Sequence, residues 1–469
     1  MTDLCYLSAL ELRDHFVRRT LSPVEVTAVL LDRIAGVNPA LNAFVTVTVE
    51  GALAQARKAE ALYAAGNAPP LAGIPFSLKD LTPTKGIRTA RGSLLYENWI
   101  PNFDVPLTER LYKAGAVLLG KTNTPEFGAG SQTFNQVFGE TRNPYDLSKT
   151  CGGSSGGAAV SVACRMLPFA DGSDLGGSLR NPTNFCNVVG FRPSVGRVPS
   201  WPSESGWNSF AVDGPIARTV EDTALMLSVL AGPDLRSPIS LPENGAVFRN
   251  SLERNLKGIR IAWSSDLGGL PVDSRVTKTL EAQRAVFEDL GCIVEEGFPD
   301  FSDADEIFKT FRAWFYEMNL SSLLPEHRDK LKETVVWNIE AGMKLSGPEL
   351  GRAEVKRTAL FHRVREFMQN YDFLALPVSQ VPPFPIEQEF VSEINGVQME
   401  TYLDWMRSCY FISVTGQPAI SVPCGFTEDG LPVGLQLVGK PQDDLGVLQL
   451  AYAFEKASGF YQQIPKVAL

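Results

Sequence analysis

Short apolar runs bounded by Gly, Pro and Asn recur between residues 71 and 439 of the chain. Short apolar runs of this kind are typical of strands buried in a sheet, and helical segments such as 108–114 and 219–231 lie between them. This alternation predicts an α/β fold. The expected strands are at 71–78, 116–123, 195–200, 259–263, 373–378, 419–425 and 433–439.

Two other parts of the sequence are mainly helical in pattern. Residues 1–65 form a helical N-terminal part, and residues 303–371, rich in Phe, Trp and charged side chains, form a helical subregion outside the α/β core. The core itself is expected at 66–300 and 372–469. Because no repeat or low-complexity linker marks a boundary, residues 1–469 are predicted to be one domain. The pattern leaves open whether the helices of 303–371 wall a substrate pocket or only pack together.

The charge balance excludes several classes of partner. The chain has 43 Lys and Arg against 53 Asp and Glu, a formal net charge of −10. A negative field repels phosphate backbones and anionic lipids, so we expect neither a nucleic-acid nor a membrane partner. No uncharged apolar stretch reaches the roughly 18 residues of a bilayer span. The N-terminus has an acid where a secretory signal has bases.

The cysteines indicate a reducing compartment. All seven are scattered along the sequence and none forms a C-x-x-C pair. We therefore expect free thiols and a cytoplasmic location.

Three segments carry residues that could perform chemistry. The first, Thr150–Gly157, reads TCGGSSGG and holds two serines in backbone that glycine makes unusually adaptable. In the second, Asp174–Pro182, a Gly-Gly pair precedes Ser178 and could aim backbone N–H groups at one point, as an oxyanion hole requires. Taken singly, the first is more often a tight glycine loop with incidental serines, and the second an ordinary turn into a helix.

The third segment, 73–80, ends an apolar run at Lys79. A lysine in apolar surroundings loses proton affinity because burial disfavours the ammonium, and the neutral amine is then a usable base. The alternative is a lysine that snorkels to solvent or pairs with the adjacent Asp80.

The scarcity of histidine weakens the rival motifs. Gly153–Gly157 fits the G-x-S-x-G nucleophile elbow, but the only downstream histidines, His327 and His362, lie in charged helical segments rather than in a loop after a strand. No S-x-x-K motif, P-loop or zinc-ligand spacing is present, so we expect no metal and no cofactor. A lysine base, two special serines and a donor loop remain, and this set can perform acyl transfer.

These residues resemble the amidase signature family of serine hydrolases. The likeness covers an ordered series of segments rather than one motif. The segments are GIPFSLKD (73–80), GKTNTPEFG (120–128), RNPYDLSKTCGGSSGGAAVSVA (142–163), SDLGGSLRNPTNFCNVVGFRPSVGRVP (173–199), DGPIARTVEDTALML (213–227) and TGQPAISVPCGFTEDGLPVGLQLVG (415–439).

The resemblance implies a role for each residue of a Ser-Ser-Lys triad. Ser178 would be the nucleophile, Ser154 would follow a cis peptide and relay a proton, and Lys79 would be the base. The oxyanion would be bound by the backbone N–H groups of Leu175, Gly176, Gly177 and Ser178.

The resemblance also implies supporting residues and a fold. Asp174 and Arg180 would hold the donor loop, and Ser155 would be an auxiliary hydroxyl. Ala129 and Ser131 would line the acyl pocket. The implied architecture is the amidase signature fold, a central mixed β-sheet covered by helices on both faces.

Departures from the family pattern bear on the substrate. The glutaminase subunit of tRNA-dependent amidotransferases has paired tyrosines where this chain has residues 351–371, and a polar stretch where this chain has Trp405–Phe411. We therefore expect a hydrolase of a small apolar or aryl amide, with ester, anilide or carbamate activity as a further expectation. The alternatives are a non-catalytic scaffold and a glutaminase-type subunit of an amidotransferase. A homodimer is left open.

Overall fold

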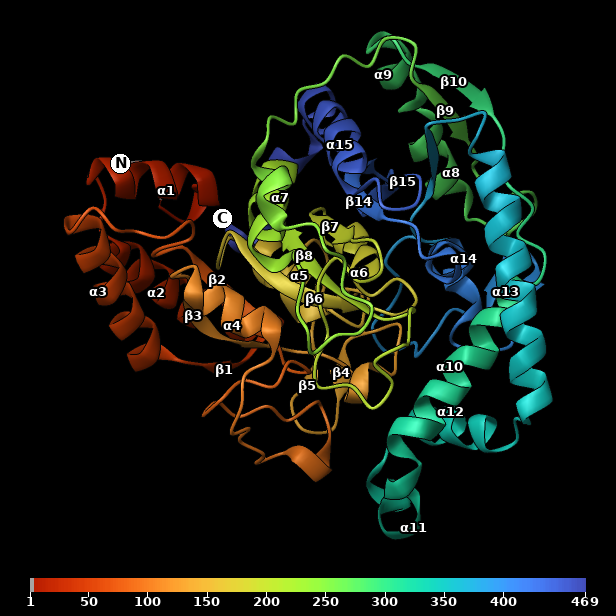
Figure 1. Cartoon of the computed structure of the whole chain (residues 1–469), viewed down its shortest axis with the longest axis horizontal. Coiled ribbons are helices and arrows are strands. Elements are labelled where there is room, and N and C mark those ends of the chain that lie inside the picture. Colours follow the sequence, from red (N-terminus) through yellow and green to blue (C-terminus); the bar gives the residue numbers. More distant parts are fainter. Residues whose placement is uncertain (1–3) are drawn as a thin grey trace.

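An eleven-stranded mixed sheet runs through the computed structural model, which describes residues 4–469 (Figure 1). Its strands, in spatial order, are β1 (Phe44–Val47), β3 (Val117–Thr122), β2 (Pro75–Lys79), β6 (Phe169–Asp174), β8 (Val212–Ala217), β7 (Val189–Arg192), β14 (Ala419–Phe426), β15 (Pro432–Val438), β11 (Phe373–Pro377), β9 (Arg260–Trp263) and β10 (Ile293–Glu296). Two small hairpins pair β4 (Phe134–Asn135) with β5 (Gly139–Glu140) and β12 (Glu393–Ile394) with β13 (Val397–Gln398).

The predicted mixed α/β architecture is confirmed. Strands β3, β2 and β6 are mutually parallel, as are β11, β9 and β10, whereas the strands between these groups are antiparallel. Every residue of β2 and β15 is buried. Since successive side chains of a strand point to opposite faces, both faces of the sheet are covered at these strands.

Fifteen α-helices accompany the sheet within residues 4–469 (Figure 1). They are α1 (Ala9–Arg18), α2 (Pro23–Leu41), α3 (Val49–Ala64), α4 (Pro106–Lys113), α5 (Gly156–Ala163), α6 (Arg180–Phe185), α7 (Val220–Leu230), α8 (Ser274–Glu281), α9 (Arg284–Asp289), α10 (Ala304–Leu320), α11 (Leu324–His327), α12 (Glu333–Met343), α13 (Gly347–Phe367), α14 (Arg407–Thr415) and α15 (Asp444–Ser458). Helices α1–α3 lie at one end of the sheet, and α10–α13 lie at the opposite side of the molecule.

One expected strand is wrong. Residues 195–200 form a turn and loop, and the strand of this region is β7, which ends at Arg192. Gly196 adopts a φ of 79°, and a side chain there would meet the carbonyl of Ile239 at 2.0 Å. The backbone therefore turns at this glycine instead of extending.

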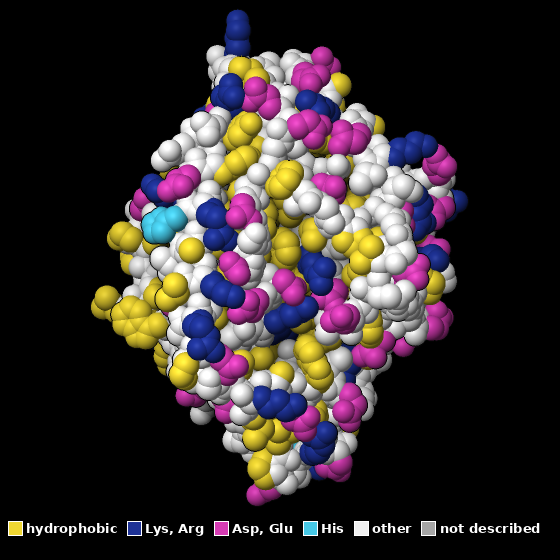
Figure 2. Space-filling view, turned by 90° about the vertical axis from the view of Figure 1, so that its right-hand side faces the viewer, with side chains coloured by type: hydrophobic (Ala, Val, Ile, Leu, Met, Phe, Trp, Pro, Cys, Tyr) yellow, Lys and Arg dark blue, Asp and Glu magenta, His cyan; other side chains and the backbone are white. Residues whose placement is uncertain are grey.

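The face that carries α10 and α13 shows basic and acidic side chains interspersed over its surface (Figure 2). Several of them pair across helices, as Lys356 of α13 does with Asp303 and Glu306, and Arg363 with Asp300. Such exposed pairs contribute little each, about 0–1 kcal/mol. The packing of α10 depends instead on a buried cluster that it shares with α13 and α14, which includes Ile307, Phe308, Leu360 and Tyr410.

Within residues 4–469, no helix has both the length and the apolar character that a membrane span requires.

Candidate active site

Lys79 ends strand β2 and is 1% exposed. Its Nζ atom lies 2.7 Å from the Oγ of Ser154, 2.9 Å from that of Ser155 and 3.1 Å from that of Ser173. No carboxylate among the described residues lies within ion-pair distance of this amine. The amine is therefore surrounded by hydroxyl groups and lacks a direct counter-ion.

Close backbone approaches bring the three hydroxyls to the lysine. Ser173 lies on β6, the parallel neighbour of β2, and Ser154 precedes Ser155, the N-cap residue of α5. A side chain at Gly157 would meet the backbone N of Asn123 at 2.3 Å, so only glycine lets α5 pack this close to the end of β3. The peptide bond between Gly153 and Ser154 is cis, as the resemblance implied.

Burial sets the protonation of Lys79. Removal from water lowers the pKa of the amine to about 7, against the opposing effect of the Asp171, Asp213 and Asp174 carboxylates, which raise it. The Asp171 carboxylate is occupied elsewhere, since it accepts the backbone N–H of Lys79 and the hydroxyl of Thr82. Lys79 is thus poised to lose its proton near neutral pH.

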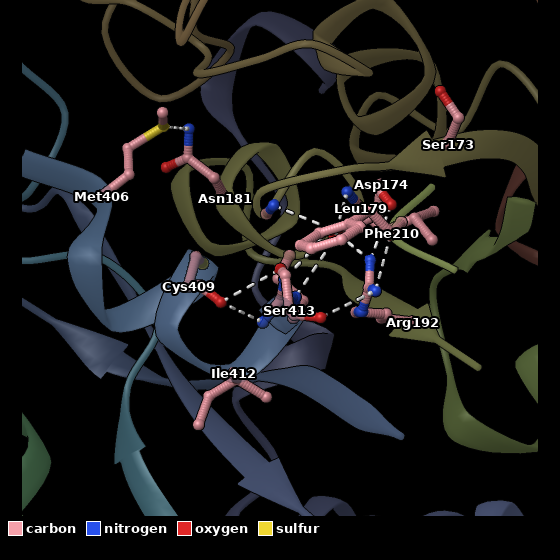
Figure 3. A network of polar contacts seen from close by, with 12 residues as sticks. Ser173, Asp174, Leu179, Asn181, Arg192, Phe210, Met406, Cys409, Ile412 and Ser413 are labelled. Carbon is pink, nitrogen blue, oxygen red and sulfur yellow. Dashed lines mark hydrogen bonds and ion pairs between the residues drawn. The ribbon is translucent and has the colours of Figure 1, made fainter. Parts of the chain in front are cut away.

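A buried ion cluster supports the loop after β6. The Asp174 carboxylate pairs with Arg180 at 3.0 Å and with Arg192 at 2.9 Å, and all three side chains are fully buried. Both arginines also reach Ser413 of α14, and Figure 3 shows Asp174, Arg192 and Ser413 of this network. Burial raises the pKa of Asp174, but the two guanidinium groups outweigh it and hold that pKa below its usual range.

The same carboxylate changes the expected set of oxyanion donors. Asp174 accepts the backbone N–H of Gly177 at 2.8 Å, so this amide, one of the four expected donors, is engaged within the protein. Among the described residues, no hydrogen bond is recorded for the N–H groups of Leu175, Gly176 and Ser178. Three of the four expected donors therefore remain available to a ligand.

A cavity of about 160 Å³ opens beside this loop. Its lining includes Ser154, Ser173 and the half-buried Ser178, which places the expected nucleophile and relay on one cavity. The Ser178 hydroxyl makes no hydrogen bond to any other group within residues 4–469. The hydroxyl is consequently free to engage a bound molecule.

The cavity wall differs from the expectation at two positions. Ala129 is fully buried against the α10–α12 side of the molecule, and Ser131 accepts the indole N–H of Trp405 at 3.2 Å. Neither lines the cavity, whereas Gly128 and Gly130 do. The backbone turns in this segment, with a positive φ at both Phe127 (49°) and Gly128 (73°).

Distant segments also supply cavity residues, which the sequence did not single out, although it left open that the helices of 303–371 wall a pocket. Phe308, Arg312, Phe315 and Tyr316 of α10 line one side. Tyr402, Leu403 and Met406 line another, while Trp405 stacks on Phe185 outside the cavity. Ser173 was also missed, because the strand that carries it, β6, was not predicted from the sequence.

None of the three histidines lines this cavity. His327 lies in α11 and His362 in α13, so the arrangement that a nucleophile elbow requires is not formed among the described residues. Nor do residues 4–469 contain a group of three or more His, Cys, Asp and Glu side chains placed to hold a metal ion.

Known proteins of one family resemble this chain in sequence. The sequence model of the family described as Amidase matches residues 25–448. The chain is 34% identical to an acylamidase of Rhodococcus erythropolis, over 100% of this chain and 98% of that protein. It is 35% identical to a glutamyl-tRNA(Gln) amidotransferase subunit of Moorella thermoacetica, over the whole length of both.

Solved structures give the same result. A bacterial aryl acylamidase of the amidase signature enzymes superposes with a TM-score of 0.91 at 29% identity, covering 97% of this chain and 98% of that one. A 6-aminohexanoate cyclic dimer hydrolase superposes with a TM-score of 0.90 at 25% identity, covering both chains completely.

Proposed function

The chain belongs to the amidase family, the amidase signature enzymes, and is an amide-hydrolysing enzyme; from this premise we propose that it works through a seryl acyl-enzyme. Ser178 is the nucleophile, Ser154 relays the proton and Lys79 is the base. The observation that carries the proposal is the buried contact of 2.7 Å between the Lys79 amine and the Ser154 hydroxyl.

The three hydroxyls around Lys79 can serve a neutral amine as well as an ammonium. A neutral amine has two N–H donors and one lone pair, whereas an ammonium has three donors. The Ser155 hydroxyl donates to the carbonyl of Ser173, so it accepts from Lys79. Ser154 has no other hydrogen-bond partner among the described residues and can give its proton to the lone pair. The amine then donates to Ser155 and Ser173.

Acylation moves one proton along this path. Lys79 takes the Ser154 proton while Ser154 takes that of Ser178, whose oxygen attacks the amide carbon. The negative charge that forms on the carbonyl oxygen is stabilised by the unengaged N–H groups near Gly176. When the C–N bond breaks, the proton returns through Ser154 to the leaving nitrogen, and the free amine departs.

Deacylation uses the same groups in reverse. A water molecule gives its proton through Ser154 to Lys79 and attacks the acyl carbon. The proton then returns to the Ser178 oxygen as the carboxylic acid leaves. Asp174 and Arg180 act as positioning residues, because they fix the loop that carries the donors. Ser155 holds the amine in place.

The cavity supports a small substrate with an apolar or aryl group. Phe127, Phe308, Phe315 and Met406 contribute apolar wall, and a volume of about 160 Å³ is below that of most ligand sites. Esters, anilides and carbamates present the same carbonyl to Ser178. The names of two relatives, an acylamidase and an aryl acylamidase, agree with this substrate class.

The second candidate is a glutaminase-type subunit of an amidotransferase complex. It is favoured by the 35% identity to the glutamyl-tRNA(Gln) amidotransferase subunit over its full length. In either case we propose that the chain acts as one domain, with α10 contributing to the wall of the site.

A hydrolysis screen tests the proposal. The purified wild type and Ser178→Ala are assayed on aliphatic amides, aryl amides, anilides, carbamates, esters and glutamine. We expect turnover of small aryl or alkyl amides that Ser178→Ala abolishes. Unchanged turnover in this variant would overturn the acyl-enzyme, and activity on glutamine alone would favour the second candidate.

A further inference from the structure

Arg312 is a buried cation without a counter-ion in the cavity that holds Ser154 and Ser178. The residue lies on α10, is 7% exposed and lines the cavity directly. Among residues 4–469, no carboxylate lies within ion-pair distance of its guanidinium; Asp404, two residues after Tyr402, pairs instead with Lys309 and Arg407. A buried charge is costly unless a partner of opposite sign accompanies it.

Only part of the hydrogen-bonding capacity of Arg312 is used within the protein. Its Nη2 atom donates to the hydroxyl of Tyr402 at 2.7 Å and to that of Tyr316 at 3.4 Å. The Nε atom is buried without a partner, and no partner is recorded for Nη1 in the described part of the chain. Three of the five guanidinium N–H groups are therefore unengaged.

The surrounding aromatic rings hold the guanidinium without neutralising it. Its centre lies 4.7 Å from the ring centre of Tyr316, 5.6 Å from that of Tyr402 and 6.0 Å from that of Phe308. Burial raises the pKa of Tyr316 to about 12, so this phenol is uncharged at neutral pH. The cation thus keeps its full charge and faces the cavity.

Tyr402 adds a further donor beside Arg312. Its hydroxyl oxygen accepts both from Arg312 and from the Asn338 amide, at 2.8 Å. Because both lone pairs of the oxygen are then occupied, its own O–H is left to donate to another acceptor. The Tyr402 ring also lines the cavity.

We propose that Arg312 and Tyr402 form a subsite for a carboxylate borne by the substrate. Guanidinium N–H groups and a hydroxyl donor match a carboxylate, which only accepts hydrogen bonds. This inference rests on the proposed function and narrows its substrate: the amide carries an apolar or aryl part and, at its other end, a carboxylate. The carboxylate belongs either to the acyl group or to the leaving amine.

Two pairs of substrates of matched shape test the subsite. In the acyl pair, the 4-nitroanilide of succinic acid is compared with 4-methylpentanoyl-4-nitroanilide, in which an isopropyl group replaces the carboxylate. In the amine pair, 4-acetamidobenzoate is compared with 4-isopropylacetanilide. We expect wild-type kcat/KM to favour the carboxylate by about tenfold or more in one pair, and that pair identifies the carboxylate's source.

Variants assign the preference to Arg312. Arg312→Gln should lower kcat/KM for the preferred carboxylate about 10- to 100-fold and leave the isopropyl substrate within about threefold. Arg312→Lys keeps the charge and should retain part of the preference. Arg357→Gln is the matched control, because Arg357 is a cation that packs 3.9 Å from the ring centre of Phe210 but does not line the cavity. It should not change the ratio.

The outcomes separate this subsite from the proposed function. If wild type favours neither carboxylate, or if Arg312→Gln leaves the preference unchanged, the subsite is overturned even though Ser178-dependent turnover continues. If Ser178→Ala does not affect turnover, the acyl-enzyme itself is wrong. Reaction of Ser178 with a small uncharged fluorophosphonate, measured in Arg312→Gln, shows whether this variant retains an intact site.

Discussion

The Lys79 amine lies 2.7 Å from the Ser154 hydroxyl at a position where the lysine is almost completely excluded from solvent. The amine is therefore both desolvated, which lowers its pKa to about 7, and in direct contact with a group that can carry its proton. The proposed chemistry depends on this contact and on the loop that faces it.

Replacement of Lys79 by methionine should remove the base and preserve the fold. We expect kcat to fall about 10²- to 10⁴-fold, the usual contribution of general-base catalysis. The free energy of unfolding should stay the same or increase, because an apolar side chain of similar size replaces a buried amine. Lys121→Met is the control, since Lys121 is equally buried but donates to Thr84 and to the backbone of Thr82. Equal losses of activity in both variants, measured with a small aryl amide, would contradict the assignment.

Serines that contact Lys79 should differ sharply in their effect on turnover. Ser154→Ala removes the relay and should lower kcat about 10²- to 10⁴-fold. Ser173→Ala removes only the contact at 3.1 Å and should lower kcat by less than about tenfold, the equivalent of one hydrogen bond. The comparison is made by steady-state kinetics on the same amide. The relay would be wrong if the order of the two effects were reversed.

The pH dependence of kcat/KM should report the protonation of Lys79. Because its pKa is lowered to about 7, the amine is charged and inactive below that pH and neutral above it. We expect the rate to rise about tenfold per pH unit on the acidic side and to level off above about pH 7.

A change at Asp213 should move this profile. Its carboxylate raises the pKa of Lys79, so Asp213→Asn should shift the acidic limb to lower pH. Asp213 lies opposite Ser173 on the neighbouring strand β8. It can therefore be replaced without changing Lys79, Ser154 or Ser178. The exposed Glu428→Gln serves as control and should leave the profile in place. A shift to higher pH in Asp213→Asn would oppose the assignment of this limb to Lys79.

Gly176 should tolerate no side chain while Phe308 is present. A Cβ at this glycine would lie 2.5 Å from the ring of Phe308, which is itself stacked on Tyr410 at 4.2 Å. Gly176→Ala should therefore displace the donor loop and lower kcat about 10²-fold, as loss of an oxyanion donor does.

The double variant Gly176→Ala, Phe308→Leu tests this explanation. The smaller leucine should leave room for the added methyl group and restore part of kcat. Additive losses in the double variant would show that the clash with Phe308 is not the cause.

Local patterns predicted much of the fold, and the exceptions have physical reasons. The helix expected at 219–231 is α7, whose N-cap Thr219 accepts the N–H of Asp222 at 3.2 Å. Strand β6 was not predicted, because its sequence FADGSD lacks the apolar run of a buried strand. Its glycine is required by packing instead: a side chain at Gly172 would lie 2.8 Å from Leu179 and 2.9 Å from Ser155.

The cavity wall was the least predictable part of the site. The positions of Lys79 and Ser154 follow from motifs, whereas Arg312 lies in a helix far along the chain with nothing local to mark it as inward-facing. Whether Gly128 or Ala129 lines the cavity depends on the local backbone, which has a positive φ at Phe127 that the residue type does not reveal. Motifs thus predicted which groups lie together at the candidate site, and tertiary packing decided what surrounds them.

The most direct test of the central claim is to identify the labelled residue after reaction with an uncharged fluorophosphonate, by mass spectrometry of the digested protein. We expect a single adduct, on Ser178, in the wild type. In Lys79→Met and Ser154→Ala this adduct should form at least about 10²-fold more slowly. An adduct on Ser154, Ser155 or Ser173, or labelling of Ser178 at the wild-type rate in both variants, would contradict the claim.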